Sequence, residues 1–246
     1  YYEHMPLRRS ALPHGPDMTL YRRVRFGWLA EFSVLDTRQY RTDQPNGDGG
    51  KPLSGAVFDP KATLLGRTQE GWLYNGLVQS PATWNVLAQQ VMVARVGGRK
   101  NGQTIYSMDQ WSGYDVARRR LMEFLKNRSV PNPIVITGDI HSNWCNDLYV
   151  DFDKLQEGPV ASEFVGTSIS SGGDGEKDSA RRSELYANNP FVKFFNAQRG
   201  YVQCTVTPKE WRSDYQGLDY VSRPGAPLVT RASFVVEEGV RGVKPA

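Results

Sequence analysis

The stretch Ile134–Asn146, IVITGDIHSNWCN, runs from a β-branched apolar segment into a group of polar residues. Its first residues, 134–136, predict a buried strand, and open α/β sheets bind their ligands at the carboxyl ends of such strands. If the backbone stays extended beyond the strand, Asp139, His141 and Asn143 point to the same side, because side chains alternate along a strand. A carboxylate, an imidazole and an amide at one point suit a divalent or trivalent metal ion.

A structural interpretation of the same stretch stays open. Asp139 can cap a turn and His141 can be an ordinary hydrogen-bonded side chain, because a motif as short as Gly-Asp-x-His recurs by chance. The chain has three histidines and two cysteines, which disfavours a zinc site built only from His and Cys. Any metal should therefore rely on oxygen ligands, which favours hard ions.

The segments on either side alternate between strand and helix patterns. An apolar stripe formed by Ala117, Leu121, Phe124 and Leu125 predicts a helix, and the arginines at 118–120 are expected on its solvated side. Ser80-Pro81 has the pattern of a helix start. The sequence predicts a layered α/β sandwich with a mixed sheet, with a second helix at 80–89 and strands at 26–35, 90–96, 134–136, 147–152, 161–166, 201–207 and 232–236.

Two further segments can bind an anion. Arg38 follows an apolar strand in the stretch LDTRQYRTD (35–43), where a planar guanidinium could hold two phosphate oxygens. The alternative is an ion pair between Arg38 and a nearby carboxylate such as Asp36. The Gly-rich stretch Ser168–Gly175 could form a backbone nest for an anion, or simply a tight loop. It lacks the lysine and the spacing of a nucleotide-binding P-loop.

The totals exclude several classes of protein. A length of 246 residues suits one large domain, and a formal net charge of +4 is only mildly basic. We find no nucleic-acid-binding module and no apolar stretch long enough to span a membrane. Anionic small molecules are therefore the partners that we expect.

Several long motifs in a fixed order resemble the PhoD-type alkaline phosphatases. The resemblance covers essentially the whole chain and is carried by YYEHMPLR (1–8), LDTRQYR (35–41), WSGY (111–114), ITGDIHSNW (136–144), TSISSGGDG (167–175) and RGYVQCTVTP (199–208).

The resemblance implies a layered α/β/β/α sandwich with mixed sheets, of the calcineurin-like metallophosphoesterase type. It implies hydrolysis of phosphomonoesters, and often of phosphodiesters, by exported enzymes that follow the twin-arginine route and hold Fe³⁺ and Ca²⁺. Carried over by motif, Asp139 and His141 would be metal ligands and Arg38 would bind the substrate phosphate. Asn143 is a supporting residue on geometry alone.

The family's small N-terminal β-domain and its first metal-ligand segments have no counterpart in these residues. We therefore expect residues 1–246 to be a single catalytic domain that is incomplete at its N-terminus, with the missing part as a possible partner. Two alternatives stay open. The chain could be a non-catalytic fragment or a partner-binding remnant of such an enzyme, or a non-metal hydrolase that uses Arg38 as an anion clamp.

Overall fold

The structure is a computed structural model, and it describes residues 2–176 and 182–246. It contains three α-helices, which are α1 (Gly66–Gln79), α2 (Asp115–Asn127) and α3 (Arg182–Asn188). Single turns of 3₁₀-helix lie at Tyr2–His4, Arg9–Ala11, Gly55–Phe58, Trp111–Tyr114 and Leu155–Glu157. The strands are β1 (Arg22–Phe26), β2 (Ala30–Val34), β3 (Gly50–Lys51), β4 (Trp84–Ala88), β5 (Gly98–Lys100), β6 (Gln103–Ser107), β7 (Pro133–Thr137), β8 (Asn143–Leu148), β9 (Ala161–Val165), β10 (Gly175–Glu176), β11 (Val192–Val206), β12 (Glu210–Leu218), β13 (Leu228–Glu237) and β14 (Lys244–Pro245).

One large mixed sheet organises the molecule, with β1-β2-β4-β7-β9-β8-β11-β12-β13-β14 as its strand order. Its neighbouring strands β2, β4, β7 and β9 are parallel. The pairs from β9 through β8 and β11 to β14 are antiparallel. Because four parallel strands lie side by side, their carboxyl ends share one edge.

The long strand β11 carries the sheet around a bend. Its first part pairs with β8 through Asn196, and its second part pairs with β12 from Arg199 onward. Gly200 lies at this change of partner with φ of 153°, and a Cβ there would come within 1.9 Å of the Gln216 carbonyl oxygen. Glycine is therefore required where β12 approaches the β11 backbone.

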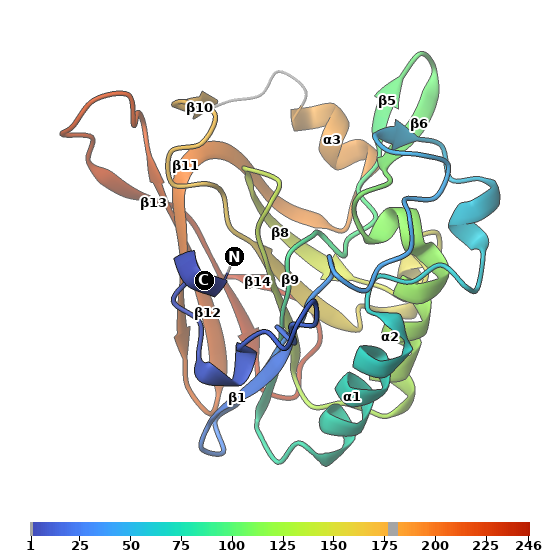
Figure 1. Ribbon diagram of the computed structural model, residues 1–246. Coiled ribbons are helices and arrows are strands. Elements are labelled where there is room, and N and C mark those ends of the chain that lie inside the picture. Colours follow the sequence, from blue (N-terminus) through green and yellow to red (C-terminus); the bar gives the residue numbers. More distant parts are fainter. Residues whose placement is uncertain (1, 177–181) are drawn as a thin grey trace.

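The two faces of the parallel strands pack against different layers (Figure 1). Helices α1 and α2 cover one face and share a core with Val135 of β7. The strands β12 and β13 lie over the other face, where Ile134 of β7 packs in a second core with Trp211 and Tyr215. Adjacent residues of one strand thus enter opposite cores, as side-chain alternation requires. The fold is mixed α/β with a large mixed sheet, as the sequence predicts.

The expected helix at 80–89 is wrong. Residues 84–88 form β4, the strand between β2 and β7, and the helix lies earlier, at Gly66–Gln79. Ser80-Pro81 therefore follows a helix instead of opening one. The expected strand at 90–96 is a buried loop, since other partners satisfy its backbone amides, as described below.

Two further expectations need correction. The apolar run 26–35 is not one strand, because Gly27 adopts φ of 53° and turns the chain between β1 and β2. Arg118 is not on a solvated helix side: it is fully buried and contacts the Asp115 carboxylate at 2.7 Å. Arg119 and Arg120 are partly exposed and pair with Asp115 and Glu70. The three consecutive arginines are therefore accounted for by ion pairs with Asp115 and Glu70, and not by a solvated helix face.

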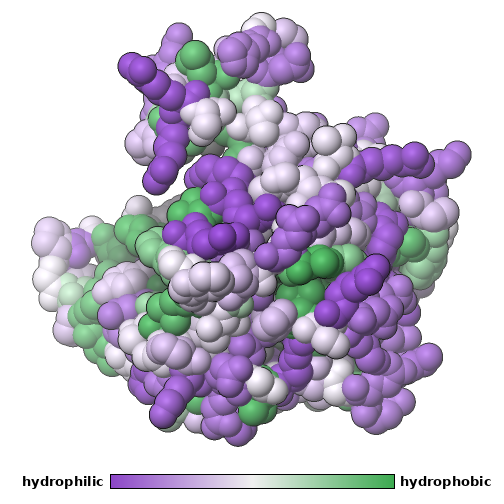
Figure 2. Space-filling view, turned by 90° about the horizontal axis from the view of Figure 1, so that it is seen from below, coloured by the Kyte–Doolittle hydropathy of each residue, from purple (hydrophilic) through white to green (hydrophobic). Residues whose placement is uncertain are grey.

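On the face seen in Figure 2, hydrophilic residues predominate and apolar residues form separate patches. In the part of the chain that the structure describes, no helix combines the length and apolar character that crossing a bilayer requires.

The buried ion pair gives a test of the fold. Replacing Asp115 with alanine leaves the Arg118 guanidinium buried without its carboxylate, so the free energy of unfolding should fall by about 3–5 kcal/mol. Glu157→Ala removes one half of an exposed ion pair with Lys126 and should cost less than about 1 kcal/mol. Urea unfolding curves of both variants and the parent measure the difference, and equal losses would contradict this assignment.

Candidate functional site

The carboxyl ends of the four parallel strands bring distant segments of the chain together. The loops that follow β2, β4, β7 and β9 start at Leu35, Gln89, Gly138 and Gly166. A hollow of 330 Å³ opens at this edge, lined by Val34, Ala88, Gln89, Gln90, Ile136 and Thr137. Ligands of open α/β sheets bind at such edges.

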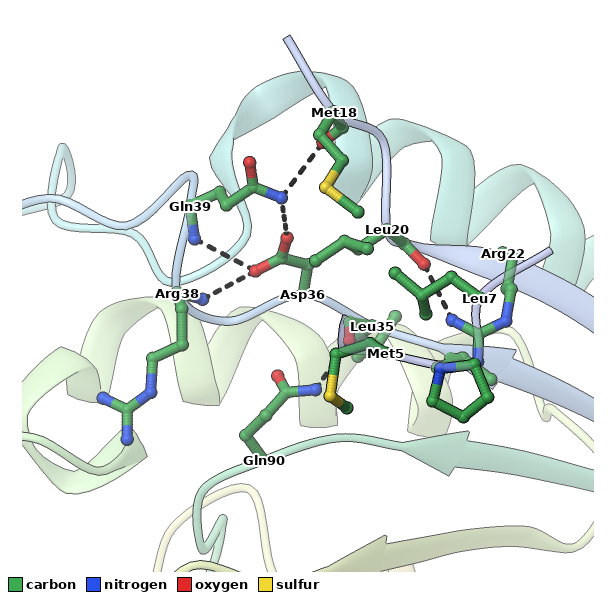
Figure 3. Close-up of a pocket in the computed structure, with 12 residues that line it drawn as sticks. Met5, Leu7, Met18, Leu20, Arg22, Leu35, Asp36, Arg38, Gln39 and Gln90 are labelled. Atoms are coloured by element: carbon green, nitrogen blue, oxygen red, sulfur yellow. Dashed lines mark hydrogen bonds between the residues drawn. The ribbon is translucent and has the colours of Figure 1, made fainter. Parts of the chain in front are cut away.

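Arg38 connects two of these loops. Its Nη2 atom lies 3.3 Å from Oδ1 of Asp139, and its Nη1 atom donates to both Asp109 oxygens at 2.8 and 2.9 Å. The hydrogen bond with Asp109 raises the pKa of Arg38. The side chain points away from Asp36, whose carboxylate instead accepts hydrogen bonds from the backbone amides of residues 38 and 39 (Figure 3). The alternative of an ion pair with a nearby carboxylate is therefore confirmed with different partners, because Arg38 pairs with Asp109 and Asp139 and not with Asp36.

Asp109 is a site residue that the sequence analysis missed. Besides Arg38, its Oδ1 accepts hydrogen bonds from Nη1 of Arg41 at 2.6 Å and from Nε2 of Gln44 at 3.1 Å. Burial alone would raise the pKa of Asp109, but the hydrogen bonds from Arg38 and Arg41 lower it overall. Its carboxylate therefore stays ionised and fixes two guanidinium groups. The only local signal was its position two residues before the Trp-Ser-Gly-Tyr motif.

The turn after β7 departs from the extended backbone that the sequence analysis assumed. Asp139 and His141 both adopt left-handed conformations, with φ of 70° and 57°, and the Ile140 amide donates to the Gly138 carbonyl oxygen at 2.9 Å. Simple alternation therefore does not orient these side chains. Residues other than glycine rarely adopt such φ values, and strained residues of this kind gather at functional sites.

A buried arginine, Arg199, holds this turn against the Gly-rich loop. One of its terminal nitrogens donates to the backbone carbonyl oxygen of His141 and to the hydroxyls of Thr167 and Ser168, while Nε donates to the Gly173 carbonyl oxygen at 2.9 Å. In the stretch 168–175, the Ser168 hydroxyl and the Gly173 carbonyl oxygen therefore accept hydrogen bonds from a cation, and residues 171–174 form a turn, as the tight-loop interpretation expects. Arg199 is the first residue of the motif RGYVQCTVTP (199–208), but the sequence analysis assigned it no role.

Asn143 lies at the start of β8 and is fully buried. Its Oδ1 accepts a hydrogen bond from the Thr167 amide at 3.1 Å, and its Nδ2 donates to Asn196 at 3.4 Å. Across the described residues, Asn143 makes no hydrogen bond to Asp139 or His141. The geometry thus connects it to the loop after β9 and not to the turn that carries the two candidate ligands.

Close to the carboxyl ends of the parallel strands, β9 contributes the fully buried carboxylate of Glu163. It accepts hydrogen bonds from the amides of Val93 and Ala94, from the Thr137 hydroxyl and from the Asn146 side chain. Burial raises the pKa of Glu163, although these donors lower it in part. The group joins the end of β7 to the loop after β4.

The donors needed for a metal are present only in part. Asp139 and His141 are exposed, and within residues 2–176 and 182–246 the His141 ring has no hydrogen-bond partner. The only partner of the Asp139 carboxylate in the same residues is Arg38. One oxygen and one nitrogen donor fit a metal ion, yet no group of three or more His, Cys, Asp or Glu side chains in these ranges could hold one.

Comparison with known proteins gives one consistent result. The sequence profile of the family "PhoD-like phosphatase" matches residues 1–215. The chain is 50% identical over 244 residues to "Alkaline phosphatase D" of Bacillus subtilis (strain 168), covering 99% of this chain and 42% of that protein. A solved structure, "Structure of PhoD", superimposes with a TM-score of 0.94 at 50% identity, covering 100% of this chain and 47% of that one. The chain thus spans less than half the length of these relatives.

The role of Arg199 can be tested by amide hydrogen exchange. Arg199→Lys keeps the charge but cannot reach several oxygens with a planar fork, so amides of residues 138–142 and 167–175 should exchange faster. Arg212→Lys alters a surface ion pair with Asp214 on β12 and should leave both segments unchanged. Protection that is equal in both variants would show that Arg199 does not hold the two loops.

Proposed function

Because the chain belongs to the PhoD-like phosphatase family, we propose that it forms part of a metal-dependent hydrolase of phosphoesters. The supporting observation is the ion pair between Arg38, after β2, and Asp139, after β7. It joins the candidate phosphate-binding group to the candidate metal ligand at the edge where such sheets bind ligands. Phosphomonoesters are the proposed substrates, with phosphodiesters as a second class.

Arg38 binds the phosphate in this proposal. Its guanidinium offers parallel N–H donors to two phosphate oxygens, and Asp109 keeps it oriented while Arg41 adds a second positive charge nearby. Water attacks phosphorus in line with the leaving alcohol, the phosphorus–oxygen bond to that alcohol breaks, and the alcohol takes up a proton. Arginine charge stabilises the equatorial oxygens of the transition state.

Asp139 and His141 are the proposed metal ligands. The donor pair suits the iron(III) and calcium that the family resemblance implies, because carboxylate oxygen binds both ions and imidazole binds iron. When bound, such ions lower the pKa of water and neutralise charge on phosphate oxygens. Both residues lie in a turn with left-handed backbone conformations, and strained residues of this kind gather at functional sites. Asn143 is the proposed supporting residue, and it acts through its hydrogen bond to the Thr167 amide in the loop after β9.

We further propose that residues 1–246 belong to a single catalytic domain of α/β/β/α type, and that residues outside this stretch complete the metal site. The supporting observation is that the described residues hold no group of three potential ligands. Export by the twin-arginine route follows from the family resemblance alone.

His141→Ala tests the metal assignment. In the longer natural protein, this variant should contain less iron and calcium and should lose hydrolysis of an aryl phosphate by at least about a hundredfold, as loss of one ligand of a catalytic metal implies. Elemental analysis and steady-state kinetics provide the two measurements. His14→Ala is the matched control, because His14 is exposed in a β-bridge with Asp17 and has no role in the proposed site. Unchanged metal content and turnover in His141→Ala would remove the assignment.

A non-catalytic role for the isolated chain is the second candidate, favoured by the incomplete ligand set. Residues 1–246 should fold but show no hydrolysis above background with added iron and calcium, while the longer protein hydrolyses the same ester. Circular dichroism checks folding, and a chromogenic phosphate ester with and without a chelator checks activity. Chelator-sensitive turnover by the isolated chain would refute the incomplete site, and chelator-insensitive turnover would favour a non-metal mechanism.

A further inference from the structure

The loop that carries Arg38 begins where β2 ends, at Val34. The Leu35 amide still donates to the Ala88 carbonyl oxygen at the end of β4, at 2.8 Å. Across the described residues, the backbone of residues 36–39 makes no hydrogen bond to other backbone groups. Buried backbone groups need partners, so side chains must supply them here.

Two glutamine side chains take the place of the missing strand neighbours. Nε2 of Gln90 donates to the Leu35 carbonyl oxygen at 2.9 Å (Figure 3), and its Oε1 accepts from the Thr37 amide at 2.9 Å. Oε1 of Gln69, in α1, accepts from the Asp36 amide at 2.8 Å, and its Nε2 donates to the Asp36 carbonyl oxygen at 2.8 Å. A side-chain amide can replace a peptide group because it carries the same donor and acceptor. Together the two glutamines bond the three residues that precede Arg38.

The next two amides are bonded by the Asp36 carboxylate. Its Oδ1 accepts from the amides of residues 38 and 39 at 2.9 and 3.0 Å. Each amide from residue 35 to residue 39 therefore has a partner, although the segment belongs to no helix or strand. From this held backbone, the Arg38 guanidinium reaches Asp109 and Asp139. A group that is ordered before it binds loses less freedom on binding.

The polar groups of both glutamines are directed at this loop and not at an open site. Gln69 is only 1% exposed, so it cannot contact a substrate. Gln90 lines the hollow at the carboxyl ends of the strands, but its amide oxygen and nitrogen both bond the loop. The Thr37 hydroxyl also donates to Oε1 of Gln90, at 2.7 Å.

We propose that Gln69 and Gln90 are positioning residues for Arg38, whose side-chain amides hold the backbone from which its guanidinium reaches a phosphate. The inference rests on the proposed function, because it assumes that phosphate binds at Arg38. Phosphate affinity then depends on two residues that do not touch the anion. Asp139 and His141 lie in a different loop, to which neither glutamine bonds in the described residues, so metal content should not depend on them.

Gln69→Met and Gln90→Met test this inference in the longer, metal-loaded protein. Methionine has a similar length but cannot bond the loop backbone. The dissociation constant of inorganic phosphate should therefore rise by up to roughly tenfold, which is what ordering one long side chain costs. KM for an aryl phosphate should rise as well, while iron and calcium contents stay at the parent values. Calorimetric titration, steady-state kinetics and elemental analysis measure the three quantities.

A double-mutant cycle with Arg38→Ala separates positioning from a general disturbance of the protein. In the Arg38→Ala background, neither glutamine variant should weaken phosphate binding further, because the guanidinium to be positioned is gone. Gln216→Met is the matched control. It makes the same substitution in β12, where Gln216 accepts a hydrogen bond from the Thr230 hydroxyl at 3.1 Å, and it should keep the parent dissociation constant.

Hydrogen exchange of the parent protein gives a further measurement, which does not require the variants to fold. The amides of residues 35–39 should exchange as slowly as those of β2, although the segment lies outside any strand. Rapid exchange of this segment would overturn the positioning role.

The outcomes separate this inference from the proposed function. If the parent hydrolyses phosphoesters and Arg38→Ala weakens phosphate binding, but both glutamine variants bind phosphate like the parent, the positioning role falls and the phosphatase proposal stands. Equal losses with and without Arg38 also overturn the positioning role. If the parent hydrolyses no phosphoester, the phosphatase proposal falls. If Arg38→Ala binds phosphate like the parent, the assignment of Arg38 falls. In both of these cases the positioning role falls too.

Discussion

The edge that carries the candidate site depends on the carboxylate of Glu163. This group is fully buried in β9, and it accepts hydrogen bonds from two amides of the loop after β4 and from the hydroxyl that ends β7. Buried backbone amides without partners are costly, so the loop at 90–94 can enter the interior only because the carboxylate is there. The turn that carries Asp139 begins one residue after that hydroxyl.

Two charged side chains, Asp109 and Arg199, organise the loops of the site through several hydrogen bonds each. Asp109 gathers Arg38 and Arg41, and Arg199 gathers the carbonyl and hydroxyl oxygens of the two loops beyond. Asp109 and Arg199 each bond several partners at once. The position of the two arginines therefore depends on Asp109, and the position of the two loops depends on Arg199. An arginine that is already oriented loses little freedom on binding a phosphate, which is the advantage of a preorganised site.

The sequence was most informative where the pattern is local. The β-branched run before Gly138 predicted β7, and the apolar stripe around Leu121 predicted α2. It failed at 80–89, because the position of β4 between two parallel strands outweighs the local helix signal. Helix α1 escaped notice because its two interior glycines, Gly71 and Gly76, weaken the helical pattern.

The same division applies to the candidate site. Arg38 and Asp139 were found from their positions after apolar strands, and the structure joins them across 101 residues of sequence. Asp109 lies 71 residues from Arg38, and Arg199 lies 58 residues from His141. Partners so distant leave no periodic signal. The left-handed conformations of Asp139 and His141 were also not predicted, because a positive φ is expected from sequence at glycine and not at Asp or His.

Strand β11 has a consequence for how such a protein can evolve. It is one continuous strand that ends the pairing with β8 and begins the pairing with β12, with Gly200 at the change. The C-terminal β12–β13 hairpin also supplies Trp211 and Tyr215 to a core shared with the parallel strands. The hairpin is therefore not an exchangeable module. Recombination that replaced it would also remove four of the ten buried residues of that core, so the hairpin should descend together with the rest of the chain.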